Sequence, residues 1–210
     1  MSPMDIARLA EQPLLVTALP PRAHESAVSS VKQERVLELG CGFNKRPGAF
    51  GVDIIAGSQA DLIHDLNVYP YPLSDNSWDR IICLDVLEHV EDFVKTVEEI
   101  WRIASSGATI EISGPFMSSV HFYTDPTHKR ALTSRSFDYF CPDRPFYRYG
   151  YTKAAFELVE CEYDRGALGH RTGIARWLTA WANKHKDKYE ERYAFLYPML
   201  QVDFTLRAIK

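Results

Sequence analysis

The sequence predicts an α/β fold built on a mostly parallel, doubly wound sheet. Short apolar runs that suit buried strands recur along the first half of the chain, at residues 35–39, 51–55, 61–66, 80–84 and 108–113. Between the last two runs, apolar residues recur at helical spacing from Phe93 to Ala104. Strands that alternate with helices favour a parallel sheet, because each parallel connection needs a crossover segment.

The first predicted strand runs into a glycine turn, and residues 36–42 read Val-Leu-Glu-Leu-Gly-Cys-Gly. Glycines at positions 40 and 42 let backbone N–H groups and a ligand come close together. Glu38 lies at the inner end of the strand, where a carboxylate is costly unless a group such as a cationic ligand pairs with it. A dinucleotide fingerprint would need a third glycine where the chain has Lys45. The turn therefore predicts a ligand site of another kind.

The second predicted strand, residues 51–55, contains Asp53. An acidic residue at the end of the second strand of such a sheet accepts hydrogen bonds from ribose hydroxyls. The usual spacing from the glycine turn is roughly 20 residues, so the connection predicted here is short. The third strand, residues 61–66, precedes a loop that the prolines of residues 69–72 enforce, and the fourth strand follows at residues 80–84.

A helix and a fifth strand complete the predicted first half. Asp92 can cap the start of the helix, and Ser-Ser-Gly at residues 105–107 ends it. The fifth strand, residues 108–113, stops at the Gly-Pro pair of residues 114–115. The second half is less regular, and we predict a long polar loop, a short helix, a strand, a long helix and a last strand at residues 116–132, 134–140, 156–163, 172–196 and 202–209.

Taken in order, these segments resemble a class I S-adenosylmethionine-dependent methyltransferase, and most closely the small type 11 methyltransferase domains. The resemblance rests on residues 38–42, 51–54, 65–67, 75–79 and 85–90. It implies a doubly wound, mostly parallel, seven-stranded Rossmann-like sheet with a reversed last strand, here preceded by a helical insertion. We expect one domain over residues 1–210, with an N-terminal helix and arm, a cofactor-binding core, a substrate loop or lid and the insertion at residues 1–33, 35–115, 116–151 and 166–197.

The resemblance also implies S-adenosylmethionine as the cofactor. Glu38 would support its methionine end, Asp53 would bind the ribose, and Asp65 with Leu66 would contact the adenine. The full set of predicted cofactor residues is Glu38, Gly40, Cys41, Gly42, Asp53, Ile54, Asp65, Leu66, Asp85 and His89. Asp53 as a cap or surface carboxylate, and His89 as a capping or packing residue at the start of a helix, remain open alternatives.

A cluster of titratable side chains follows the fifth strand, in His121-Phe-Tyr-Thr-Asp-Pro-Thr-His-Lys-Arg130. Ligands bind at the carboxyl ends of strands in open α/β sheets, so the segment projects toward the methyl donor. His128, or else His121, is a candidate general base for an acceptor hydroxyl, with Asp125 fixing its tautomer. A divalent metal site and a purely structural lid are the alternatives. The pattern assigns no metal ligands.

The function that we predict is methyl transfer to a small-molecule or glycan acceptor, favouring an oxygen. N-methylation of an amine or protein side chain, and a non-catalytic cofactor-binding subunit, remain alternatives. The net charge of −4 argues against a nucleic-acid substrate, and no apolar stretch approaches the ~20 residues of a membrane span. Without a signal-peptide pattern we expect a cytoplasmic protein, with a homodimer as one option for its assembly.

Overall fold

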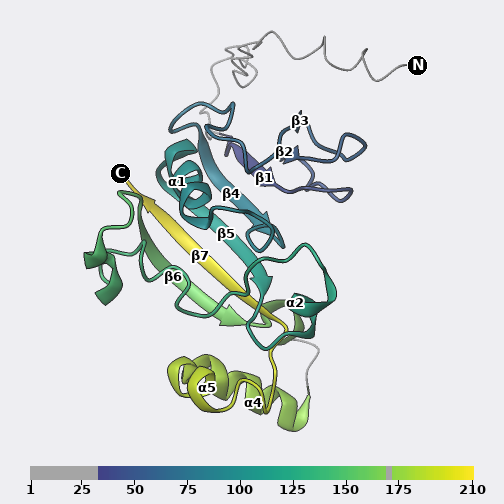
Figure 1. Cartoon of the computed structure of the whole chain (residues 1–210), viewed down its shortest axis with the longest axis vertical. Coiled ribbons are helices and arrows are strands. Elements are labelled where there is room, and N and C mark those ends of the chain that lie inside the picture. The colour runs from purple at the N-terminus through teal and green to yellow at the C-terminus, as the bar shows by residue number, and fades with distance from the viewer. Residues whose placement is uncertain (1–32, 169–171) are drawn as a thin grey trace.

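The computed structural model describes residues 33–168 and 172–210, so nearly all of the predicted N-terminal arm, residues 1–33, lies outside the described part. Its strands form one seven-stranded sheet in the order β3-β2-β1-β4-β5-β7-β6 (Figure 1). The strands are β1 (Val36–Leu39), β2 (Phe50–Asp53), β3 (Leu62–Ile63), β4 (Trp78–Leu84), β5 (Ala104–Pro115), β6 (Ala155–Tyr163) and β7 (Gln201–Ile209).

The direction of the strands confirms the predicted fold class. Strands β1 to β5 pair in parallel, and β7 pairs antiparallel with β5 on one side and with β6 on the other. The last strand is therefore reversed, as the resemblance implied. The chain runs outward from β1 to β2 and β3 and then returns to place β4 on the other side of β1. Such a reversal of strand order leaves a crevice at the carboxyl ends of β1, β2 and β4, where ligands bind in open α/β sheets.

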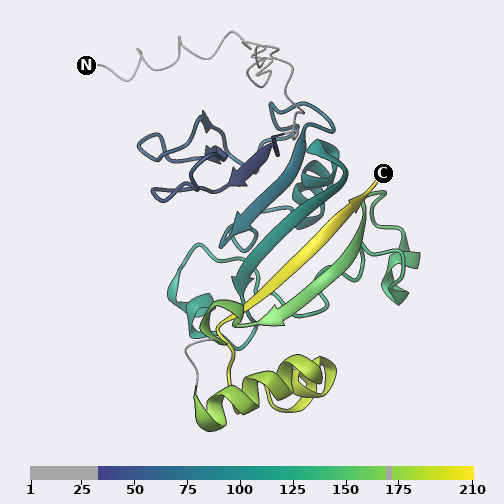
Figure 2. The ribbon, with the colours of Figure 1, turned by 180° about the vertical axis from the view of Figure 1, so that it is seen from behind.

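Helices cover the sheet unevenly. Within residues 36–115, all of which are described, α1 (Phe93–Ile103) is the only helix, and Figure 1 shows it against β4 and β5. Asp92 caps α1 as predicted, since its side chain accepts a hydrogen bond from the Lys95 N–H. Seen from behind (Figure 2), the other face of β4 and β5 carries no helix among the described residues, and the short α3 (Arg165–Leu168) contacts β7 on this side through Arg165. That face is polar, and Glu111 at its centre is paired with Arg80.

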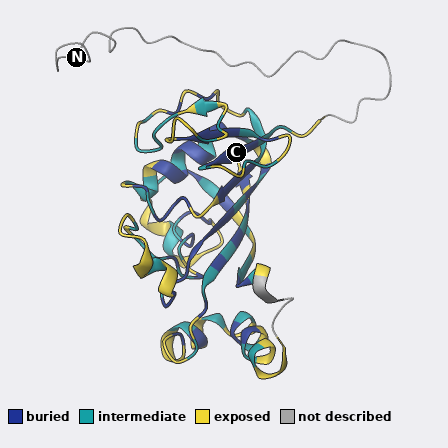
Figure 3. Cartoon of the chain, turned by 90° about the vertical axis from the view of Figure 1, so that its right-hand side faces the viewer, coloured by how far each residue is buried: buried dark blue, intermediate teal, exposed yellow. Residues whose placement is uncertain are grey.

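All the remaining helices of the described residues follow β5 along the chain. They are α2 (Val120–Thr124), the 3₁₀ helix η1 (Pro145–Tyr149), α3 (Arg165–Leu168), α4 (Gly173–Lys184) and α5 (Lys186–Arg192). The last two form a lobe past the ends of β6 and β7, with buried and exposed faces that Figure 3 distinguishes. No helix in the described ranges combines the length and apolarity needed to cross a bilayer.

Several details of the predicted secondary structure are wrong, and the third strand, predicted at residues 61–66, covers only Leu62–Ile63. Residues 134–140 form turns, because their backbone hydrogen bonds, such as Phe140 N to Phe137 O, span three residues and not four. The helix predicted at residues 172–196 is broken at His185, whose φ and ψ of −128° and 52° are not helical. Residues 105–107, predicted to end the first helix, belong instead to β5, because α1 ends at Ile103.

The hydrophobic core lies between the sheet and α1 and continues under the second half of the chain. Ile81, Ile110 and Phe204, from adjacent strands, are fully buried there together with Val97 and Ile100 of α1. The buried residues therefore hold β4 and β5 rigidly, and these two strands carry the segments that enter the crevice.

Candidate functional site

A first cavity of about 600 Å³ opens at the carboxyl ends of β1, β2 and β4. Its lining contains most of the predicted cofactor residues, namely Gly40, Asp53, Ile54, Asp65, Leu66, Asp85 and His89. It also contains side chains that the sequence analysis did not single out, which are Ile55, His64, Asn67, Val86, Val90 and Thr127. Carboxylates and apolar side chains alternate around it, so the cavity can hold a ligand with both polar and flat apolar parts.

Asp53 joins the two loops that form one wall of this cavity. Its Oδ2 accepts a hydrogen bond of 2.8 Å from the Gly42 N–H, and its Oδ1 accepts one of 2.9 Å from the Ile55 N–H. The residue is only 7% exposed. A carboxylate has about four acceptor positions, so Asp53 keeps capacity for ligand hydroxyls while it holds both loops.

The glycine turn contributes mainly through its backbone. Gly40 has a φ of +68°, and an added Cβ would lie 2.3 Å from Cγ2 of Val86, so this position has no room for a side chain. Glu38, Cys41 and Gly42, which the resemblance also assigned to the cofactor, do not line the first cavity. Glu38 accepts a hydrogen bond of 2.6 Å from the Arg46 N–H, which gives this buried carboxylate a partner inside the protein.

The segment after β3 is tied to the segment before α1. Asp65 accepts hydrogen bonds from the backbone and side-chain nitrogens of Asn67, at 2.9 and 3.0 Å. Asn67 in turn accepts a hydrogen bond of 2.7 Å from the Glu91 N–H. These contacts fix Leu66 between them at the cavity wall, where the sequence predicted an apolar contact with a flat ring.

Asp85 stands where the first cavity meets a second one. It follows β4 with a φ of +52°, a conformation that non-glycine residues adopt rarely. Gln201, the first residue of β7, donates a hydrogen bond of 2.9 Å to its carboxylate. Partial desolvation by the surrounding protein raises the pKa of Asp85, and the nearby Asp203 carboxylate adds to this effect.

The second cavity, of about 330 Å³, is lined by Asp85, Glu88, Pro115, His121, His128 and Gln201. Glu88 is fully buried, and neither of its carboxylate oxygens has a hydrogen-bond partner among the described residues. Burial, with smaller contributions from the carboxylates of Asp85 and Asp125, raises the pKa of Glu88 to about 7. His128 Nε2 faces Glu88 Oε1 at 3.9 Å, which is longer than a hydrogen bond.

Two histidines are held in defined orientations beside Glu88. His128 lies 3.0 Å from the Phe122 carbonyl through its Nδ1, and since a carbonyl only accepts, this nitrogen carries the proton. The prediction that Asp125 fixes the tautomer of His128 is therefore wrong, because the Phe122 carbonyl makes this contact. Asp125 instead accepts a hydrogen bond of 2.6 Å from the Thr127 hydroxyl, and that hydroxyl lies 2.8 Å from His89 Nδ1.

His89 differs from its predicted setting. It lies in a turn, and the helix starts only at Phe93. Its ring lies 4.6 Å from the ring of His128. Burial lowers the pKa of His89, and the neighbouring His128 lowers it further. His89 therefore borders the first cavity and belongs to the same cluster as Glu88 and His128.

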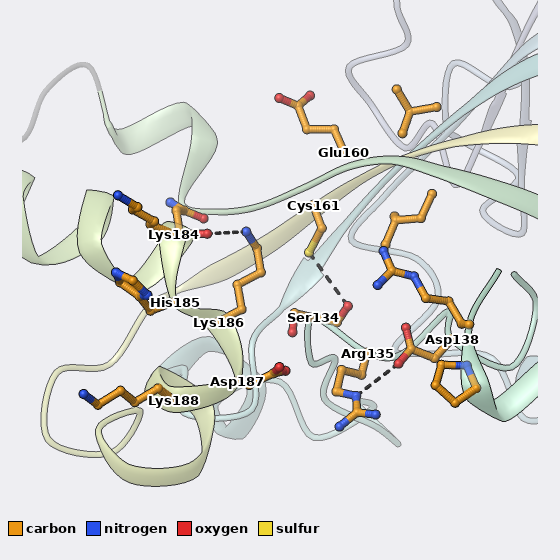
Figure 4. A pocket seen from close by; sticks show the side chains of 15 residues that line it. Ser134, Arg135, Asp138, Glu160, Cys161, Lys184, His185, Lys186, Asp187 and Lys188 are labelled. Atoms are coloured by element: carbon orange, nitrogen blue, oxygen red, sulfur yellow. Dashed lines mark hydrogen bonds and ion pairs between the residues drawn. The ribbon is translucent and has the colours of Figure 1, made fainter.

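The largest cavity lies elsewhere. It measures about 750 Å³ and lies between β6, the turns at residues 134–138 and the junction of α4 with α5. Figure 4 shows its charged lining, in which Arg135 pairs with Asp138 at 3.0 Å and Lys186 turns back to the Asn183 carbonyl. It contains none of the predicted site residues and does not touch the carboxyl ends of β1, β2 and β4. We therefore assign the functional site to the first two cavities.

The aromatic stretch at residues 137–151 divides into two groups. Phe137 and Phe140 are buried in the main core. Tyr139 packs against the edge of this core, and the rings of Phe146 and Tyr151 stack on it, with centroid distances of 5.1 and 5.2 Å. The stack lines neither of the two site cavities.

Comparison with known proteins gives a match for part of the chain. Residues 49–112 match a family model described as a methyltransferase domain. The match spans β2 to β5 and begins after the glycine turn, so it does not include Glu38 or Gly40. A search of curated proteins finds no match.

Similar solved structures cover most of the chain at low identity. A S-adenosylmethionine-dependent methyltransferase from Archaeoglobus fulgidus is 17% identical, with 83% of this chain and 86% of that chain covered and a TM-score of 0.50. A S-adenosylmethionine-dependent methyltransferase from Mesorhizobium loti is 16% identical, with 83% and 90% covered and a TM-score of 0.49. Phosphoethanolamine N-methyltransferase 2 from Haemonchus contortus, in complex with S-adenosylmethionine, is 14% identical, with 84% and 48% covered and a TM-score of 0.48. At 17% identity, the similarity to the Archaeoglobus fulgidus structure supports a shared fold.

Proposed function

We propose that this chain, a S-adenosylmethionine-dependent methyltransferase by its domain match and its fold, methylates a hydroxyl oxygen of a small-molecule or glycan acceptor. One observation carries the proposal for the acceptor. The second cavity adjoins the first at Asp85 and is lined by two imidazoles, His121 and His128. A hydroxyl acceptor needs a proton acceptor at that place, and imidazole is the side chain best suited to it near neutral pH.

The first cavity fits the cofactor. Asp53 has acceptor capacity for ribose hydroxyls, and Leu66, Val86 and Val90 offer apolar surface for a flat ring. The carboxylate of Asp85, at the border with the second cavity, suits the positively charged end of the cofactor. When bound, S-adenosylmethionine supplies a methyl carbon to the acceptor oxygen, and the electron pair of the broken carbon–sulfur bond stays on sulfur.

The residues of the second cavity orient the acceptor and remove its proton. His128 has its Nδ1 proton held by the Phe122 carbonyl, so its Nε2 has a free lone pair in the neutral ring. His121, on the exposed helix α2, is the other candidate. Holding the hydroxyl in line with the methyl carbon supplies a further part of the rate.

The test is a screen of sugars, phenols and amines with methyl-labelled cofactor, followed by identification of the methylated atom. General base catalysis typically contributes 10²–10⁴-fold, so losing the base should lower kcat by about that factor. We expect this loss for His128→Ala or His121→Ala, with nearly unchanged affinity for S-adenosylhomocysteine. His185→Ala is the matched control, because this imidazole lines the largest cavity and not the second one. Full turnover in both cavity variants would contradict the use of a histidine base.

An amine acceptor is the second candidate, and the carboxylates favour it. Asp85 and Glu88 both line the second cavity and could hold an ammonium group. An ammonium group loses its proton more readily than a hydroxyl, and the neutral amine then attacks through its lone pair, so histidine variants would keep most of their turnover. The methylated atom in the product, nitrogen or oxygen, decides between the two candidates.

A further inference from the structure

We propose that Glu88, His89 and His128 bind a divalent transition-metal ion. One donor atom from each of the three side chains lies within 4.8 Å of the others, so small side-chain movements would let a single ion contact all three. The sequence pattern assigned no metal ligands because it considered the segment at residues 121–130 by itself. The fold adds Glu88 and His89 from the turn after β4.

The first reason is the state of the Glu88 carboxylate. Its side chain is 1% exposed, and neither oxygen has a hydrogen-bond partner among the described residues. A buried ionised carboxylate without a partner is costly, and buried charges in proteins are normally paired or coordinate a metal. The closest cationic candidate, His128 Nε2, stops at 3.9 Å. A metal ion between these groups would satisfy the carboxylate.

The second reason is the orientation of the two imidazoles. The Phe122 carbonyl holds the Nδ1 proton of His128. The Thr127 hydroxyl donates to Asp125 and can therefore only accept from His89, so His89 also carries its proton on Nδ1. Metal-binding histidines show this arrangement, with the outer N–H held by a carbonyl or a carboxylate-linked group.

When Glu88 is ionised, the three side chains together present acceptors and no donor. The neutral rings of His89 and His128 each keep a lone pair on Nε2, and Glu88 adds its unpaired oxygens. Such a group has no positive partner among the described residues. The ligand set of two imidazoles and one carboxylate is that of zinc enzymes and of non-haem iron sites, and it does not suit magnesium or calcium.

Three protein ligands leave a position open on a tetrahedral ion. The second cavity lies next to Glu88 and His128, so an acceptor oxygen could occupy that position. This consequence rests on the proposed function. A metal ion lowers the pKa of a bound hydroxyl. His128 would then be a ligand, which leaves His121 to take the proton.

The experiment titrates the full-length protein, free of any histidine tag and stripped with a chelator, with Zn²⁺ and with Co²⁺. Calorimetry should show one ion per chain, and the Co²⁺ form should have the visible absorption of a low-coordinate site. Loss of an outer-shell partner typically weakens metal affinity by about 10–100-fold, so Thr127→Val should have that effect. Glu88→Gln and His128→Ala should weaken it by more than about 100-fold, since they remove ligands.

Controls separate a built site from adventitious binding. His121→Ala and His185→Ala each remove one imidazole, as His128→Ala does, but from outside the proposed ligand set. Both variants should therefore bind the ion as the unaltered protein does. Binding of S-adenosylhomocysteine and the far-ultraviolet circular dichroism report on folding in every variant. If Glu88→Gln does not fold, His89→Ala carries the test, because His89 is only half-buried.

The inference is overturned if the folded, unaltered protein shows no saturable binding of either ion. Binding that Glu88→Gln, His89→Ala and His128→Ala leave unchanged overturns it as well. Neither cofactor nor acceptor is present in the titration, so a negative result leaves the proposed methyl transfer standing. A protein that binds the ion and methylates no acceptor would refute the proposed function and keep the metal site.

Discussion

Replacement of Asp53 should weaken the cofactor site and the fold together. Asp53→Ala removes the acceptor for the Gly42 and Ile55 N–H groups, at 2.8 and 2.9 Å. Hydrogen bonds to charged groups contribute about 1.5–3 kcal/mol each. Water can reach the cavity side and replace part of this, so we expect the free energy of unfolding to fall by about 3 kcal/mol. A lost hydrogen bond from a ribose hydroxyl should weaken cofactor binding by about 1.5–3 kcal/mol, roughly 10–150-fold in Kd.

Urea unfolding and calorimetry with S-adenosylhomocysteine measure the two effects separately. Asp53→Asn keeps one acceptor oxygen and should fall between the unaltered protein and Asp53→Ala in both. Asp61→Ala is the matched control, because Asp61 also accepts from a backbone N–H, that of Gly51 at 2.7 Å, but lies outside the first cavity. It should lower stability and leave the affinity unchanged. A folded Asp53→Ala variant with an unchanged Kd would remove Asp53 from the cofactor site.

Three other outcomes follow from the structure. Gly40→Ala should destabilise the protein by about 2–5 kcal/mol in urea unfolding, through a left-handed backbone and a clash with Val86, and Val86→Ala in the same chain should recover part of the loss. Glu190→Ala should lower the free energy of unfolding by about 2–4 kcal/mol, because one oxygen of Glu190 accepts hydrogen bonds from the Tyr163 hydroxyl and the Ser134 N–H. Glu190→Gln keeps an acceptor oxygen and should lower it by less, so equal losses in the two variants would contradict this reasoning. S-adenosylmethionine and S-adenosylhomocysteine should bind in calorimetry and NAD should not, and tight NAD binding alone would refute the cofactor assignment.

The first cavity was predictable because local sequence patterns build it. Each of Gly40, Asp53 and Asp85 directly follows or ends a short apolar run, and parallel strands bring their carboxyl ends to one edge. The order of these residues along the chain was therefore enough to assemble the cavity. The reversed direction of β7 was implied by the family resemblance, and the antiparallel pairing of β7 with β5 confirmed it.

The second cavity depends on contacts that no local pattern contains. Glu88 was visible as a carboxylate among apolar neighbours, but its lack of a partner depends on what the rest of the fold places around it. The partner of His128 is a backbone carbonyl, that of Phe122, which any residue could supply. Likewise, the break at His185 depends on how α4 packs against β6. Asn183, near the end of α4, binds the backbone N–H and carbonyl of Tyr163 through its side-chain oxygen and nitrogen.

The neck of the α4–α5 lobe, where residue 164 meets residues 200–201, makes the lobe a unit that could be replaced by another segment. Asp164 accepts hydrogen bonds of 2.8 Å from the N–H groups of both Leu200 and Gln201, so the chain leaves and rejoins the sheet at one carboxylate. A different lobe grafted onto this neck would keep β6 and β7 in register, provided that it covers Phe116 as Tyr189 does. Gln201 belongs to β7 and would keep its hydrogen bond to Asp85, and no residue of α4 or α5 lines either site cavity, so both cavities should keep their linings in such an exchange. Chimaeras built at this junction could therefore change the surface beside the sheet while the two cavities stay as they are.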